Sequence, residues 1–213
     1  MVWLIIIGVL ALAVGPIFYM LPSAQDRYLA GLRLQARQLG FSMQLRPLML
    51  LDPTAEERVT ASGRALKPMF DCMCYEWLAR QPLYNSPDIL LQRLPQTPTI
   101  PVHECAPGWG FAKQGERSER DLAGWALLSQ QTTFQNSLLD TLRNLPKSVV
   151  AVALHGTAVG VYWRENAAAQ SDLETNDRLQ VAGRQLQQLR DQTDALCAEL
   201  VAIFGIVTDS TKS

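Results

Sequence analysis

Residues 149–163 read VVAVALHGTAVGVYW, and this stretch decides the fold. Two apolar runs, 149–154 and 158–163, flank the link His155-Gly156-Thr157. Apolar runs of this length that are rich in β-branched residues are typical of strands, and a three-residue link that contains glycine suits a hairpin. The sequence therefore predicts a pair of antiparallel strands at this point of the chain.

Two earlier segments also have the composition of strands. Residues 41–45 alternate apolar and polar side chains as FSMQL, which is typical of a half-buried strand. Another strand is expected after Pro68, in a segment that contains Phe70 and Trp77. We expect an α+β fold with a short, mainly antiparallel sheet, because turns rather than regular crossover helices join the strands. The strands are predicted at residues 41–46, 68–78, 149–154 and 158–164.

A helix is expected directly before the first of these strands. Ser23 and Asp26 stand three residues apart, as in a capping box, and Gly40 is placed to end the helix. Its polar face carries arginines, so two interpretations stay open: an ordinary domain helix, or a helix that lies on anionic lipid. Later in the chain, the proline-rich residues 81–110 are predicted to form a loop.

Residues 171–204 contain no proline and are predicted to form one long helix. Along it, apolar or small residues recur at alternating spacings of three and four, which is a heptad pattern. This seam consists of Leu179, Ala182, Leu186, Leu189, Thr193, Leu196, Leu200 and Ile203. The helix either pairs with another chain or packs on the sheet of its own chain. Pairing would make Leu186, Leu189, Leu196 and Leu200 partner-binding residues.

Near the N-terminus, residues 2–21 read VWLIIIGVLALAVGPIFYML and carry no charged side chain. Twenty helical residues at about 1.5 Å each match the ~30 Å apolar thickness of a bilayer, so we expect a transmembrane helix. A cleaved signal peptide and a buried helix are the alternatives, although no Lys or Arg precedes the run as in signal peptides. The arginines that follow place the rest of the chain in the cytoplasm. Within the span, Gly8, Ala11 and Gly15 would let a partner helix approach closely.

The composition limits the remaining classes of protein. With 213 residues and 19 basic against 20 acidic side chains, the chain lacks the broad basic surface of nucleic-acid-binding proteins. A hydrophobic content of 48% excludes a disordered chain. Residues 23–213 have the length of one domain. A domain of this size needs no disulfides, so we expect reduced thiols in the cytosol, with a disulfide-bonded periplasmic domain as the alternative.

Sequence motifs of well-known catalytic sites are missing. The chain has no P-loop, no dinucleotide-binding glycine motif, no zinc-protease motif and no nucleophile elbow. One candidate group is left, which has the Cys₃His composition of some zinc sites: Cys72, Cys74, His103 and Cys105. If both pairs lie on strands, same-face neighbours stand about 7 Å apart, which is wide for the ligands of one zinc ion. We therefore expect buried structural cysteines and no cofactor, with a metal site or a redox pair as alternatives.

Several features resemble a group of uncharacterised bacterial single-span membrane proteins. They are Gly15-Pro16 in the span, Leu21-Pro22-Ser23 after it, the helix to Leu39-Gly40, residues 41–45 and residues 150–165. Some members of the group carry labels akin to the translocase accessory subunit YajC, but the chain has no match to the small domain of YajC. The resemblance implies a bacterial inner-membrane protein and gives no functional residue.

These observations together predict a single-pass inner-membrane protein with a cytoplasmic domain. We expect a non-enzymatic accessory or scaffold subunit of a membrane complex. Its partners would be the lipid bilayer and either a membrane protein or a second copy of the chain, with no nucleic acid. The alternative is a metal- or thiol-dependent membrane-bound enzyme or sensor that uses Cys72, Cys74, His103 and Cys105.

Overall fold

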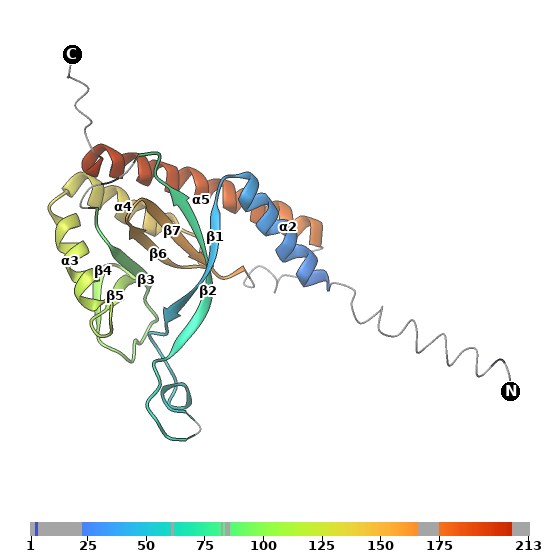
Figure 1. The fold of residues 1–213 in the computed structure, drawn as a ribbon, viewed down its shortest axis with the longest axis horizontal. Helices are drawn as coiled ribbons and strands as arrows, with labels where there is room; N and C mark the ends of the chain where they lie inside the picture. The colour runs from blue at the N-terminus through green and yellow to red at the C-terminus, as the bar shows by residue number, and fades with distance from the viewer. Residues whose placement is uncertain are drawn as a thin grey trace, which may run out of the picture.

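The computed structural model describes residues 3, 23–60, 62–81, 83, 86–165 and 175–205. These residues form one seven-stranded antiparallel sheet and four α-helices (Figure 1). The strands are β1 (Ser42–Met49), β2 (Met69–Leu78), β3 (Ile89–Arg93), β4 (Val102–Ala106), β5 (Trp109–Ala112), β6 (Val149–His155) and β7 (Ala158–Trp163). The helices are α2 (Ala24–Gln38), α3 (Ser118–Ser129), α4 (Thr132–Asn144) and α5 (Thr175–Phe204). In the sheet, the strands follow the order β1-β2-β7-β6-β3-β5-β4.

The hairpin predicted from residues 149–163 is confirmed as β6 and β7, near the centre of the sheet. Val152 pairs with Val161 and His155 pairs with Ala158, and the backbone turns at Gly156, which has a φ of 53°. Every residue of β7 is buried, which explains why the run is apolar throughout instead of alternating. The hairpin therefore supplies the middle of the sheet, to which β2 adds on one side and β3 on the other.

The predicted fold class needs a correction that concerns the extent of the sheet. The sheet is not short, because the proline-rich residues 81–110, predicted to form a loop, contain β3, β4 and the beginning of β5. The prolines stand outside these strands: Pro87 precedes β3, and Pro95, Pro98 and Pro101 lie between β3 and β4. Proline cannot donate to a sheet ladder, so it bounds such short strands without interrupting them.

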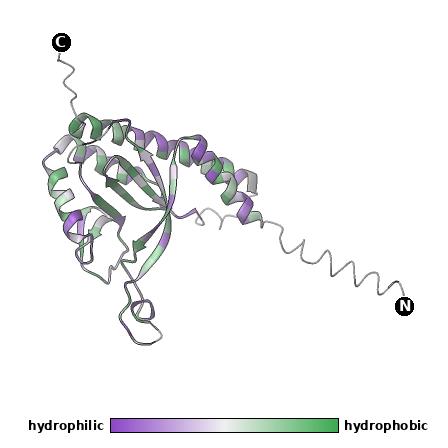
Figure 2. Ribbon diagram, viewed as in Figure 1, coloured by the Kyte–Doolittle hydropathy of each residue, from purple (hydrophilic) through white to green (hydrophobic). Residues whose placement is uncertain are grey.

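The main hydrophobic core lies between one face of the sheet and the helices. Tyr75, Leu91 and Trp163 reach it from the strands, and Phe134 and Leu138 reach it from α4. Figure 2 shows the central strands as largely hydrophobic, whereas α2 and α5 are mixed in character. The helices therefore bury one face and leave the other to solvent, as amphipathic helices do.

The heptad seam of α5 belongs to this core. Leu186, Leu189, Leu196 and Leu200 are each 2% exposed or less and contact other core residues of the same chain. The structure therefore favours the packing alternative, in which the seam lies against the sheet and α2 of its own chain. A helix that packs on one sheet over several turns shows the same spacings of three and four as a coiled coil.

Helix α2 begins with the predicted capping box and lies along α5 (Figure 1). The hydroxyl of Ser23 accepts from the backbone N–H of Asp26 at 3.1 Å, and the Asp26 carboxylate accepts from the Ser23 N–H at 3.0 Å. Contact with α5 is close, since a Cβ added at Gly31 would lie 3.1 Å from Leu179 Cδ2. Arg33 also binds Glu165 through two hydrogen bonds of 3.1 and 2.6 Å. In the structure α2 is thus packed as a helix of the domain.

The predicted membrane location also needs correction. Among the helices in the described residues, none combines the length and the apolar character that crossing a bilayer requires. Helix α2 has 15 residues, and the 30-residue α5 carries charged side chains along its length, such as Arg184, Arg190 and Asp194. Residues 2–21, which gave the transmembrane prediction, lie outside the described residues except for Trp3. The prediction of a single-pass inner-membrane protein is corrected on this finding.

Candidate functional site

The sheet face that points away from the core helices forms a second apolar cluster. It consists of Leu48, Cys72, Cys74, Leu90, Ala151, Ala153 and Tyr162, all at most 9% exposed. We call this the inner face, because the sheet curls so that its two halves approach each other over it. The backbone N–H of Thr99, after β3, donates to the carbonyl of Leu51, after β1, at 3.1 Å. Residues from opposite halves of the sheet thus enclose a common space.

That space is a cavity of about 320 Å³. One side is lined by β1 and β2, the other by β3, β5 and the beginning of α3, although β7 and β6 separate these pairs in the sheet. The lining residues are Pro47, Met49, Lys67, Met69, Leu90, Gln92, Ala112, Gln114, Gly115, Glu116, Arg117, Ser118 and Asp121. Most of the exposed wall surface is apolar, although seven of the thirteen lining residues are polar or charged. A concave space that combines apolar walls with polar groups is typical of a small-molecule site.

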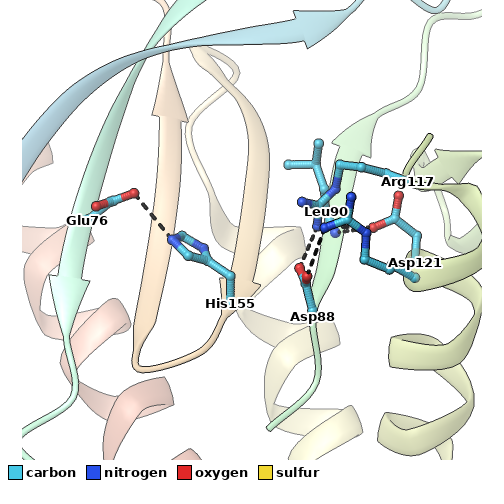
Figure 3. Close-up of polar contacts among 7 residues, drawn as sticks. Glu76, Asp88, Leu90, Arg117, Asp121 and His155 are labelled. Atoms are coloured by element: carbon cyan, nitrogen blue, oxygen red, sulfur yellow. Dashed lines mark hydrogen bonds and ion pairs between the residues drawn. The ribbon is translucent and has the colours of Figure 1, made fainter. Parts of the chain in front are cut away.

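Charged side chains meet at the α3 side of the cavity (Figure 3). Arg117 binds Asp88 at 2.6 Å and Asp121 at 3.4 Å. Asp121 also accepts a hydrogen bond from the backbone N–H of Leu90 at 2.9 Å, which ties α3 to β3. This close approach requires Gly124, because a Cβ there would lie 2.6 Å from the carbonyl oxygen of Asp88. Arg117 is thus held in place by two carboxylates from two different segments.

Burial raises the pKa of Asp121 above its usual value, while the N–H of Leu90 and the charge of Arg117 oppose that rise. Both carboxylates are bound through Nη2 of the Arg117 guanidinium, whereas its Nε is fully enclosed and has no hydrogen-bond partner among the described residues. A buried donor without an acceptor lowers stability, and because this Nε is enclosed, a molecule in the cavity does not reach it.

Gln92 is the most deeply buried of the uncharged polar side chains that line the cavity. It is 7% exposed and lies two residues after Leu90 on β3, so both side chains are on the inner face. The residue lines both the cavity and an adjacent hollow of about 270 Å³. Within the part of the chain that the structure describes, no hydrogen bond to its carboxamide is found, and its amide atoms are not among the fully enclosed unpaired atoms. The carboxamide therefore stays accessible and can pair with water or with a ligand in the cavity.

A second charged group lies farther along the inner face. Glu76 is 5% exposed and is bound by Arg46 at 2.6 Å and by His155 at 3.3 Å. Figure 3 shows the contact between Glu76 and His155 over the β6–β7 hairpin, and the Arg117 group beside the hairpin, next to α3. Gly160 leaves room for the neighbouring side chains of Cys74 and His155, because a Cβ there would lie 2.9 Å from Cys74 Sγ and 3.5 Å from His155 Cε1. Buried Glu76 is therefore compensated within the protein and needs no ligand.

The predicted metal or thiol residues are not brought together. Cys72 and Cys74 lie on β2, and His103 and Cys105 lie on β4, five strand spacings or about 24 Å away along the sheet. In the described residues, no three His, Cys, Asp or Glu side chains are placed to share a metal ion. Burial raises the pKa of Cys72 to about 11, and those of Cys74 and Cys105 to about 12. Such thiols stay protonated at neutral pH and are poor nucleophiles.

The other predicted partner-binding residues belong to the predicted membrane span. Gly8, Ala11 and Gly15 lie outside the described residues. Sequence reasoning also missed the cavity residues Gln92, Arg117 and Asp121. One local signal could have indicated them: residues 89–92 read ILLQ, where a strand would place the polar Gln92 on the same face as Leu90.

Comparisons with known proteins give no further guide to the site. No family model, no curated protein and no solved structure matches the chain.

Proposed function

We propose that the chain is a non-enzymatic accessory protein that acts by binding a small molecule in the inner-face cavity. The observation that supports this most is the buried carboxamide of Gln92, which faces the cavity with no hydrogen-bond partner among the described residues. Because the amide atoms of Gln92 are not enclosed, a ligand in the cavity can pair with them.

The chemistry of the walls favours holding a ligand over reacting with it. Arg117 and Asp121 face each other as an ion pair, and Lys67 and Glu116 form another pair at 2.5 Å at the surface. Each titratable group of the lining is thus engaged by an opposite charge. The accessory role expected from the sequence is kept in this proposal and is narrowed to ligand binding.

A thermal-shift screen tests the proposal. The full chain would be heated with a library of uncharged, anionic and cationic fragments, alone and beside the variant Ala112→Phe, which fills the cavity. A fragment at tenfold its Kd should raise the Tm by roughly 3–5 °C. Fragments that stabilise the natural chain should leave Ala112→Phe unchanged.

The matched control is Ala123→Phe, which adds the same ring at an exposed position of α3. Its response to each fragment should equal that of the natural chain. If no fragment distinguishes the natural chain from Ala112→Phe, the proposed function is wrong.

A further inference from the structure

We propose that the cavity selects a small uncharged molecule with an apolar body and one carbonyl or amide head, which the carboxamide of Gln92 binds. This inference rests on the proposed ligand-binding function and specifies its ligand.

Charge balance in the lining argues against an ionic ligand. Two cationic side chains, Lys67 and Arg117, and two anionic ones, Glu116 and Asp121, line the cavity. Each cation is bound to one of these anions, and Arg117 is bound to Asp88 as well. A charged ligand would bring an uncompensated charge into a mostly apolar space, which is expensive. An uncharged ligand leaves the existing pairs intact.

The unpaired carboxamide of Gln92 specifies the head of the ligand. It offers two N–H donors and one acceptor oxygen. A carbonyl oxygen can accept from its N–H groups, and an amide can in addition donate to its oxygen. A purely apolar ligand would cover the carboxamide without pairing it, which costs affinity.

The walls specify the body of the ligand. Apart from its polar groups, the cavity is lined by Pro47, Met49, Met69, Leu90 and Ala112. Methionine side chains are flexible and polarisable, so they adapt to flat or irregular apolar shapes. A volume of about 320 Å³ is at the small end of the ~300–1,000 Å³ range of ligand pockets. The body is thus small, on the scale of a substituted bicyclic ring.

Two fluorescent probes of this size test the inference with the full chain. Prodan is an uncharged naphthalene with a ketone, and 1-anilinonaphthalene-8-sulfonate carries a negative charge. We expect prodan to bind saturably at one site with a blue-shifted emission, and the sulfonate to bind at least tenfold more weakly. Ala112→Phe should abolish prodan binding.

Gln92→Leu removes the hydrogen bonds at nearly constant volume and should weaken prodan binding about tenfold. The same variant should keep or raise the Tm, because it replaces an unpaired buried carboxamide by an apolar group. Gln96→Leu makes the same change at an exposed loop position and should leave both properties unchanged. A merely structural role for Gln92 would instead lower the Tm and leave prodan affinity intact.

The outcomes separate the inference from the function on which it rests. If the sulfonate binds more tightly than prodan and Ala112→Phe abolishes that binding, the cavity is a ligand site but the inferred ligand class is wrong. Prodan binding that is insensitive to both Gln92→Leu and Ala112→Phe also overturns the inference. Absence of binding by either probe overturns it too, while the fragment screen decides separately on the proposed function.

Discussion

Gln92 and its neighbour Leu91 show how single residues are assigned to the two faces of the sheet. Leu91 is fully buried in the core beneath the helices, whereas Leu90 and Gln92 lie on the inner face. This alternation follows from the pleat of the strand, which turns successive side chains to opposite faces. The polar side chain at position 92 therefore belongs to the wall of the cavity and not to the main core.

The cysteines give a prediction at the same scale. Burial raises the pKa of Cys72 and Cys197 to about 11, and of Cys74 and Cys105 to about 12. At pH 8 the folded chain should therefore react with Ellman's reagent about a hundredfold more slowly than an exposed thiol. Four thiols per chain should react promptly in concentrated urea.

Ser62→Cys supplies the internal control, because this exposed position adds one fast-reacting thiol to the folded chain. Prompt labelling of any native cysteine at pH 8 would contradict the prediction and revive a thiol-based function. The same shifts have a consequence for stability. As the pH rises above about 9, the unfolded chain releases thiol protons that the folded chain retains, so the free energy of unfolding should fall.

At the scale of secondary-structure elements, the burial of the α5 seam predicts that a charged substitution in it lowers the stability of the fold. Leu189 is 1% exposed and packs in the core, so Leu189→Glu places an unpaired charge among apolar side chains. We expect a loss of several kcal/mol, which is comparable to the total stability of a domain. Circular dichroism during urea unfolding should show no cooperative transition.

Val181→Glu is the matched variant on the same helix. Val181 is 40% exposed, so its change should stay within about 0.5 kcal/mol. Should Leu189→Glu unfold with the midpoint of the natural chain, the seam would not be part of the core, and the partner-binding interpretation would regain its basis.

Elements with a strong local pattern could be predicted from the sequence, and the others could not. The hairpin β6–β7, the capping box of α2 and the long α5 follow from periodicity and turn chemistry within a few residues. Strands β3, β4 and β5 have only four or five residues each and stand among prolines, so no periodicity develops. Their places in the sheet depend on pairing with β6, which is far away in the chain.

The candidate site was missed for a related reason. Arg117 and Asp121 are one helical turn apart and look like ordinary charges at the start of a helix. They become part of a cavity only because the sheet curls and brings β1 and β2 opposite α3. Composition alone suggested a metal site that includes Cys72 and His103, but the structure places these residues on separate strands, β2 and β4.

At the scale of the whole molecule, the curl of the sheet is the feature on which the cavity depends. If the sheet were flat, β1 and β5 would be five strand positions apart and could not line one space. Antiparallel sheets twist as they widen, and seven strands allow the two halves to turn toward each other. A chemical crosslink between the two halves of the sheet therefore tests the architecture of the site directly.

Lys67 and Glu116 are placed to form such a crosslink. Lys67 precedes β2 and Glu116 precedes α3, yet the Nζ and Oε1 atoms lie 2.5 Å apart at the edge of the cavity. A water-soluble carbodiimide activates the carboxylate and lets the amine form an amide, with no spacer between the residues. We expect mass spectrometry of the digested monomer to show a peptide pair joined through residues 67 and 116.

Lys67→Arg keeps the charge but offers no amine, so its monomer should lack this peptide pair. The natural chain treated in guanidinium chloride should lack it as well. Both residues are exposed, so the ion pair adds little stability and the variant stays folded. A folded chain that forms amides elsewhere but never between residues 67 and 116 would show that the two halves of the sheet do not close over the inner face.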